Sequence, residues 1–174
     1  RNSLQIGNSV INCLFIKSTI DESSLRSLDY IIDNITKKDV LITLPMTKNQ
    51  FKFNSKILAG HTEYFRHRFN NKNISMVFLS ENEHVLLLTD HIKLKDVSIK
   101  ITSKLIVEQI GTTIRNYNHY FKNKLTRIII AGINPHAGED GILGNEEENI
   151  KKAIKKLKQE FKEIEFLGPV PGDA

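Results

Sequence analysis

Two histidines of this chain come directly after short, mainly apolar runs and are candidate metal ligands. His91 follows residues 85–90, and His136 follows residues 128–135. In open α/β sheets ligands gather beyond the carboxyl ends of the strands, so two imidazoles at one edge would suit a borderline divalent metal such as zinc. The alternative is a surface or structural imidazole, which is the interpretation for three histidines within or beside predicted elements: His67, His84 and His119.

The loop that carries His136 is richer than a connecting turn requires. Pro135 fixes the backbone just before the imidazole, while Gly138 and Gly141 permit positive φ. Glu139 could orient a metal-binding side chain through a hydrogen bond. A long polar connecting loop is the alternative interpretation.

A second site candidate is the turn Gly60-His61-Thr62 at the predicted start of a helix. Free backbone N–H groups at a helix N-terminus bind anions such as phosphate, and the Thr62 hydroxyl would add another donor. The alternative is an ordinary helix cap.

These residues must be positioned by short β-branched runs that alternate with amphipathic segments. Asp21 and Asn145 are predicted to cap helices. Apolar residues at helical spacing predict helices over 21–35, over 102–121 and from 145 onward. Strands are predicted at 9–16, 40–44, 74–79, 84–88, 127–131 and, more weakly, 165–167. The alternation predicts an α/β domain with a largely parallel sheet and one hairpin at 74–88.

The chain has 174 residues, of which 40% are hydrophobic, so we expect one folded domain or most of one rather than a disordered chain. Cys13 is the only cysteine and lies in an apolar run, so we expect it to be a small buried residue. A single cysteine forms no internal disulfide, and no run is long enough for a membrane span or a signal peptide. We therefore expect a cytoplasmic protein that does not enter a membrane.

The net charge of +5 comes from 25 basic and 20 acidic residues. Five of the basic residues are lysines on the helix from Asn145, where they alternate with an apolar stripe and follow Glu146, Glu147 and Glu148. Glutamates suit the positive end of the helix dipole. Since no aromatic residues are interleaved with the lysines and no nucleic-acid motif is present, we interpret them as a solvated face and expect no nucleic-acid partner.

Four motifs, in their order and spacing, resemble the 4-hydroxythreonine-4-phosphate dehydrogenases of pyridoxal phosphate biosynthesis. The motifs are Gly60-His61-Thr62-Glu63, residues 90–97 (DHIKLKDV), residues 134–139 (NPHAGE) and Gly168-Pro169-Val170-Pro171. The resemblance covers nearly the whole chain but only about the central half of a family member. Because the chain also begins at Arg1, we expect residues 1–174 to be the central metal- and substrate-binding and dimerisation part of a longer two-domain enzyme.

The resemblance implies roles for individual residues. His91 and His136 align with metal-binding histidines, and His61 and Thr62 align with the pair that contacts the phosphorylated substrate. Lys48, in Leu44-Pro45-Met46-Thr47-Lys48, is a secondary site candidate. The family's third metal histidine lies in a later segment and comes from the partner subunit, which implies a homodimer with an active site shared between subunits.

The resemblance also implies a fold and a reaction. The expected fold is the three-layer α/β/α architecture of isocitrate and isopropylmalate dehydrogenases, which agrees with the absence of a Gly-x-Gly-x-x-Gly motif. The cofactor would be NAD or NADP, together with zinc, magnesium or cobalt. The family oxidises 4-phosphooxy-L-threonine to 2-amino-3-oxo-4-phosphooxybutanoate, which loses carbon dioxide to give 3-amino-2-oxopropyl phosphate.

Two departures from the family pattern lie next to His91. Asp90 stands where the family usually has threonine, and Lys93 stands where it has proline. A carboxylate beside the imidazole would tune metal affinity. Two other functions stay open from the sequence: a paralogous dehydrogenase that acts on another phosphorylated hydroxy acid, and a metal-binding module without catalytic activity.

Overall fold

The computed structural model describes residues 2–6, 8–17, 19–47, 51–53 and 56–172. The chain forms two compact units, Arg1–Asn70 and Asn71–Ala174. Each unit has a hydrophobic core of its own.

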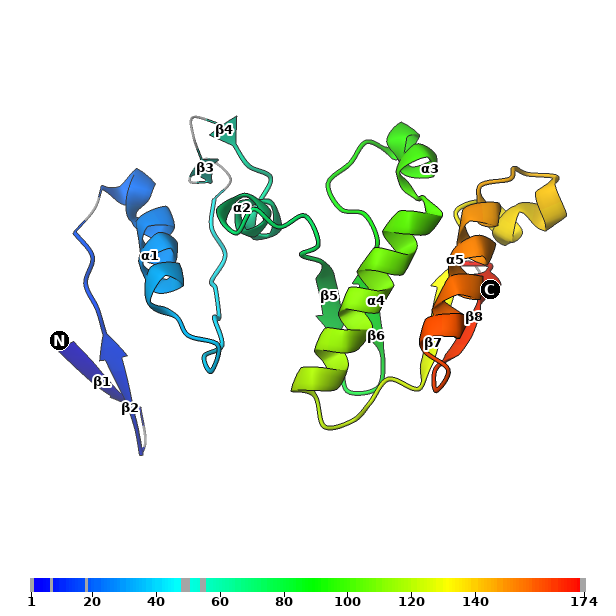
Figure 1. The fold of residues 1–174 in the computed structure, drawn as a ribbon. Coiled ribbons are helices and arrows are strands. Elements are labelled where there is room, and N and C mark those ends of the chain that lie inside the picture. The colour runs from blue at the N-terminus through cyan, green and yellow to red at the C-terminus, as the bar shows by residue number, and fades with distance from the viewer. Residues whose placement is uncertain (1, 7, 18, 48–50, 54–55, 173–174) are drawn as a thin grey trace. The chain divides into compact units, whose positions relative to one another are not determined.

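The described residues of the first unit form two antiparallel strand pairs and two helices, which can be followed in Figure 1. Strands β1 (Asn2–Ile6) and β2 (Ser9–Cys13) pair antiparallel, as do β3 (Lys52–Phe53) and β4 (Lys56–Ile57). The helices are α1 (Ile20–Asn34) and α2 (His61–Arg68). Their apolar faces and the β3–β4 region form the core of the unit, which consists of Leu28, Ile32, Phe51, Leu58 and Tyr64.

Helix α1 matches the predicted helix over 21–35 within one residue. Leu28 and Ile32 of the predicted apolar stripe are buried, whereas Ile31 is exposed. The helix begins at Ile20 with Thr19 as N-cap, so the prediction that Asp21 caps it is wrong. Cys13, predicted to be buried, is partly exposed.

The predicted strand over 40–44 does not form. Val40 and Ile42 are 86% and 85% exposed, and the segment pairs with no strand among the described residues. Alternating β-branched residues favour extended backbone, but a strand also needs a partner edge that satisfies its backbone groups.

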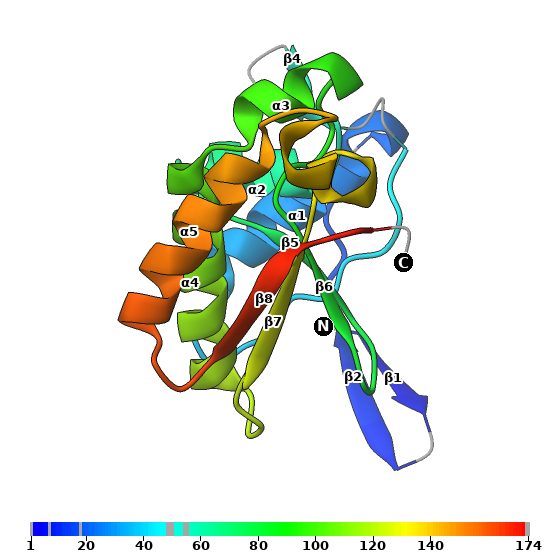
Figure 2. The ribbon, with the colours of Figure 1, turned by 90° about the vertical axis from the view of Figure 1, so that its right-hand side faces the viewer.

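The second unit contains two strand pairs and two long helices. Its strands are β5 (Met76–Leu79), β6 (His84–Leu87), β7 (Arg127–Ala131) and β8 (Glu165–Val170). Its long helices are α4 (Ser103–Tyr120) and α5 (Glu147–Glu160). A short 3₁₀ turn η2 (Leu94–Asp96) leads into α3 (Val97–Lys100), and a second turn, η3 (Pro135–Gly141), follows β7. Helices α4 and α5 pack side by side, and α5 also packs on β8 (Figures 1 and 2).

The apolar stripes predicted for α4 and α5 form the core of the second unit. Ile106, Ile110 and Ile114 of α4 are at most 3% exposed. From α5, the residues Ile150, Ile154, Leu157 and, just after the helix, Phe161 join the same core. Thr102 caps α4 by accepting a hydrogen bond from the backbone N–H of Leu105, as N-cap threonines do.

The predicted α/β class is confirmed, but the expected largely parallel sheet is wrong for the described residues. Strands β7 and β8 pair parallel, with α5 as the crossover helix between them. The other three described pairs are antiparallel hairpins, including the predicted hairpin of β5 and β6. The physical reason is the connection length, because a short turn can join only antiparallel neighbours.

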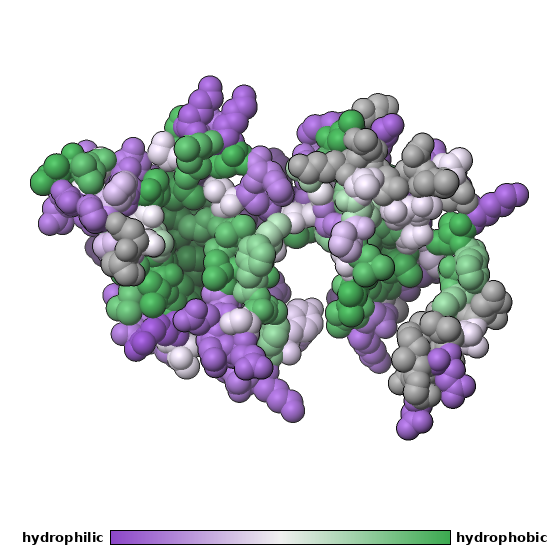
Figure 3. All heavy atoms as spheres, turned by 180° about the vertical axis from the view of Figure 1, so that it is seen from behind, coloured by the Kyte–Doolittle hydropathy of each residue, from purple (hydrophilic) through white to green (hydrophobic). Residues whose placement is uncertain are grey.

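Seen from behind, the second unit presents a broad apolar surface (Figure 3). The large apolar side chains that its strands leave exposed are Phe78, Leu79, Val85, Ile129 and Leu167. No helix in the described part of the chain is long and apolar enough to cross a membrane.

Candidate functional site

His61 and Thr62 lie where the sequence places them, at the first turn of α2 with Gly60 as N-cap. The His61 ring packs edge-on against Phe51, with 4.8 Å between ring centroids. Its Nε2 is buried and has no hydrogen-bond partner among the described residues. Burial lowers the pKa of this imidazole, because a charged ring loses more hydration than a neutral one.

Glu63 holds the turn in front of α2. Its Oε2 accepts the backbone N–H of Ala59 at 2.6 Å, and its Oε1 lies 3.4 Å from Lys56 Nζ. The hydrogen bond from Ala59 is the main reason that the pKa of Glu63 lies below its ordinary value. This carboxylate thus fixes the residues that precede His61.

The other side of α2 is tied to α1. The Tyr64 side chain is fully buried and donates a hydrogen bond to Asp29. Burial, followed by the hydrogen bond to Asp29, raises the pKa of the Tyr64 hydroxyl. Arg68, the last residue of α2, pairs with Asp29 and Asp33, so α2 is held to α1 by a buried aromatic side chain and by ion pairs.

His91 lies in the segment between β6 and α3. It is exposed and adopts positive φ, at 51°. The segment is held at both ends, because Leu88 before it and Val97 after it pack against the core of the second unit.

His136 lies in η3, whose backbone is left-handed over five consecutive residues. The φ angles are 52° at His136, 53° at Ala137, 82° at Gly138, 44° at Glu139 and 52° at Asp140. Left-handed backbone costs about 1–2 kcal/mol for each residue with a Cβ. Such a run persists only where its surroundings determine it, and such strain is concentrated at functional sites.

The buried carboxylate of Glu147 holds this loop. Glu147 is 3% exposed, and its Oε1 accepts the backbone N–H groups of Ile133 at 3.1 Å and Asn134 at 2.7 Å. The Asn134 side chain donates to Glu147 Oε2 at 3.1 Å and to Glu146 Oε2 at 2.9 Å. Burial alone would raise the pKa of Glu147, but the hydrogen bonds from Asn134 and Ile133 hold it below its ordinary value.

Gly138 is required for this arrangement. A Cβ at this position would lie 2.7 Å from Glu147 Oε2, closer than real Cβ contacts allow. Its φ of 82° is also natural only for glycine. The conformational role of Gly138 follows from the sequence, whereas the carboxylate that packs against it does not.

Sequence reasoning missed Glu147 as a loop anchor and assigned the orienting role to Glu139, which is exposed. A signal was present, since Glu147 lies three residues before Ile150 on the buried stripe of α5. A carboxylate on the apolar face of a helix needs a partner. Helix α5 begins at Glu147 with Glu146 as N-cap, so the prediction that Asn145 caps it is wrong.

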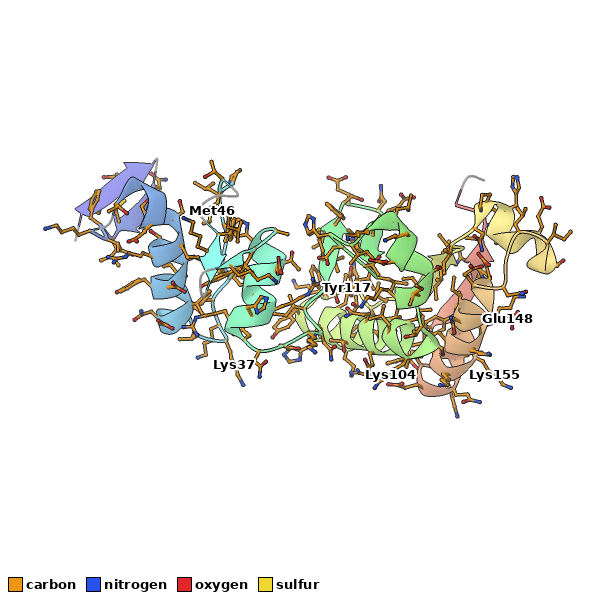
Figure 4. All side chains as sticks on the ribbon, turned by 90° about the horizontal axis from the view of Figure 1, so that it is seen from above. Lys37, Met46, Lys104, Tyr117, Glu148 and Lys155 are labelled. Atoms are coloured by element: carbon orange, nitrogen blue, oxygen red, sulfur yellow. The ribbon has the colours of Figure 1, made fainter. Side chains whose placement is uncertain are left out.

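The lysines of α5 lie on its exposed face, as predicted. Lys151 pairs with Glu148 at 3.0 Å, and Figure 4 labels Glu148 and Lys155 on this helix. The exposed lysines of the helix are Lys151, Lys152, Lys155, Lys156 and Lys158.

His91 and His136 are suitable as two of the ligands of a metal site. His91 and His136 both belong to the second unit, and each follows a strand that packs on the same core, through Leu86 and Ile130 respectively. The described residues contain no group of three or more His, Cys, Asp and Glu side chains arranged to hold a metal. The two imidazoles therefore supply at most two ligands. Lys48, the secondary site candidate, lies outside the described residues.

A family model matches residues 15–174, and its description is "Pyridoxal phosphate biosynthetic protein PdxA". Two similar curated proteins are both named 4-hydroxythreonine-4-phosphate dehydrogenase. The protein from a Sulfurihydrogenibium species is 38% identical over 155 residues, which cover 87% of this chain and 48% of that protein. The protein from Vibrio vulnificus is 37% identical over 136 residues, which cover 78% and 41%. The chain thus spans about half the length of the curated relatives it matches.

Solved structures agree with these matches. The chain is similar to a 4-hydroxythreonine-4-phosphate dehydrogenase from Klebsiella pneumoniae with a TM-score of 0.62 and 30% identity, over 75% of this chain and 39% of that one. A structure from Burkholderia phymatum with the same name gives a TM-score of 0.56 and 32% identity, over 66% and 34%.

Proposed function

The chain belongs to the PdxA family of pyridoxal phosphate biosynthetic proteins, and from that membership we propose that the full-length protein is an NAD(P)- and metal-dependent dehydrogenase. Its substrate is 4-phosphooxy-L-threonine, which is oxidised to 2-amino-3-oxo-4-phosphooxybutanoate. This β-keto acid loses carbon dioxide to give 3-amino-2-oxopropyl phosphate. In this proposal residues 1–174 form the central part of a two-domain cytoplasmic enzyme with the three-layer α/β/α architecture of isocitrate dehydrogenases.

The main observation in favour of the proposal is that His91 and His136 lie on segments that leave the same hydrophobic core. The His91 segment and the His136 loop both leave the hydrophobic core of the second unit, and each imidazole is exposed on left-handed backbone. Neutral imidazoles suit zinc and cobalt, while magnesium prefers oxygen ligands. A divalent metal held there would polarise the substrate hydroxyl and lower its pKa, so that hydride passes to the nicotinamide.

His61 and Thr62 bind the phosphate end of the substrate. The first-turn N–H groups of α2 and the Thr62 hydroxyl donate to phosphate oxygens, as helix N-termini do for anions. The buried Nε2 of His61 faces no partner among the described residues, and in the Nε2–H tautomer of the neutral ring it supplies a further donor. These residues orient the substrate and take no part in hydride transfer.

The proposal includes a homodimer whose partner subunit completes the metal site. Two imidazoles are fewer than the three protein ligands usual in catalytic zinc sites, and the described residues contain no complete cluster. A partner subunit would supply the missing ligand.

The test is a substrate panel for the full-length protein with NAD, NADP and each of zinc, magnesium and cobalt. The proposal predicts reduction of one nicotinamide cofactor with 4-phosphooxy-L-threonine. Turnover only with another phosphorylated hydroxy acid would instead assign the protein to a paralogous dehydrogenase. Metal binding without turnover on any substrate would favour a module without catalytic activity.

A further inference from the structure

Resting on the proposed function, we infer that Glu147 is a positioning residue that acts on the proposed metal site through the His136 loop. Glu147 contacts the loop on both sides of His136. Before the imidazole it accepts the backbone N–H groups of Ile133 and Asn134, and after it the Gly138 backbone packs against the carboxylate. The carboxylate thus fixes where the left-handed turn starts and where it passes α5.

The contacts of Glu147 serve the loop more than the helix. Helix α5 is already anchored by Ile150, Ile154 and Leu157, which are at most 7% exposed. An apolar side chain at position 147 would extend that stripe without the desolvation of a buried charge. A carboxylate at this position instead supplies acceptors for three N–H donors of the loop.

Asn134 extends this anchor to the turn itself. Its side chain bridges Glu146 and Glu147, and its backbone carbonyl accepts the N–H of Ala137. His136 therefore lies in the sequence between Asn134, which is held by Glu147, and Ala137, which is held by Asn134. Partners beyond the direct ligands that orient a metal-binding histidine typically change metal affinity about 10–100-fold when they are removed.

The experiment compares the full-length wild type with Glu147→Gln and Glu148→Gln. Both variants remove one negative charge from the first turn of α5, but Glu148 is exposed and pairs only with Lys151 among the described residues. Circular dichroism checks the fold, amide hydrogen exchange reports on residues 133–141, and calorimetric titration with Zn²⁺ gives the metal affinity.

Glu147→Gln should raise the exchange rates of residues 133–141 at least about tenfold, while α4 exchanges as in the wild type. Its Zn²⁺ dissociation constant should rise about 10–100-fold. Glu148→Gln should match the wild type in both measurements. Wild-type loop exchange and Zn²⁺ affinity in Glu147→Gln would overturn the inference. A uniform rise in exchange through α4 and β7, with unchanged Zn²⁺ affinity, would also overturn it, because Glu147 would then serve stability alone.

Two further outcomes separate this inference from the proposed function. If the wild type binds no Zn²⁺, Co²⁺ or Mg²⁺, the proposed metal site is wrong. The proposed effect of Glu147 on metal binding is then wrong as well. If Glu147→Gln does not fold, Gly138→Ala keeps the carboxylate but displaces it from the turn. That variant should show the same faster loop exchange and weaker Zn²⁺ binding, and wild-type values for both would overturn the inference.

Discussion

The backbone N–H of Asn134 donates to the carboxylate of Glu147 across 2.7 Å, in a place where Glu147 is 3% exposed. A buried carboxylate is stable only when donors replace its hydration. Here the donors come from the loop that presents His136, so the start of α5 and the candidate metal loop form one hydrogen-bonded unit.

This relationship predicts how stability depends on pH. Hydrogen bonds from the loop hold the pKa of Glu147 below its ordinary value of 4.5. A carboxyl with a depressed pKa contributes stability above pH 4.5 that is lost as the pH falls through its folded pKa. Glu147→Gln should therefore lower the free energy of unfolding by about 1–3 kcal/mol at pH 7. Urea unfolding of both proteins between pH 7 and pH 3 measures the difference, which should shrink below pH 4.5. A difference that is constant over this range would contradict the assignment.

The packing of His61 predicts its titration. Because burial against Phe51 lowers its pKa from 6.5, the imidazole should stay neutral at pH 7. The unfolded chain takes up the proton first, so stability should fall as the pH drops below 6.5. NMR titration of the ring Cε1–H signal, assigned with His61→Gln, should give a midpoint below 6.5. A midpoint at or above that value would show that the ring is hydrated or paired with an anion.

Substitutions of Thr62 test the proposed phosphate contact at the start of α2. Thr62→Ala removes one donor and should raise KM for the phosphorylated substrate about 10-fold with kcat little changed, because the contact is the same in the ground and transition states. Thr62→Ser retains the hydroxyl and should keep the wild-type KM. Steady-state kinetics of the full-length variants decides the matter. A large fall in kcat at unchanged KM would place Thr62 in the chemical step.

The second unit contains a buried and an exposed leucine that form a matched pair. Leu157 on α5 is fully buried, whereas Leu94 in η2 is 90% exposed. Leu157→Ala should cost about 2–5 kcal/mol of unfolding free energy through lost burial and a cavity. Leu94→Ala should stay within about 0.5 kcal/mol. Chemical denaturation measures both, and equal losses would refute the packing described for α5.

Much of this fold follows from local pattern. The stripes of α4 and α5 and the bounds of β7 follow from apolar spacing, because helix and strand periods determine which residues share a face. The family resemblance in the four motifs was confirmed by the family match. The predicted helix start at His61 and Thr62 is confirmed, because α2 begins directly after Gly60.

Other features depend on contacts that local pattern does not contain. Residues 40–44 have strand-like composition but no partner edge in the described chain, so they stay unpaired. The left-handed turn runs through Ala137, Glu139 and Asp140, although glycine is the residue that favours such backbone. Glu147 at the start of α5 packs against Gly138 of this turn, and this is a tertiary contact.

The most direct test of the account is NADH or NADPH formation by the full-length protein given 4-phosphooxy-L-threonine and a divalent metal, run beside its His136→Ala variant. The wild type should turn over, lose turnover on metal chelation and recover it when metal is restored. In the variant kcat/KM should fall at least about 100-fold, while circular dichroism should show that it remains folded. Equal, chelator-resistant turnover by both proteins would contradict the role assigned to His136 and to its loop.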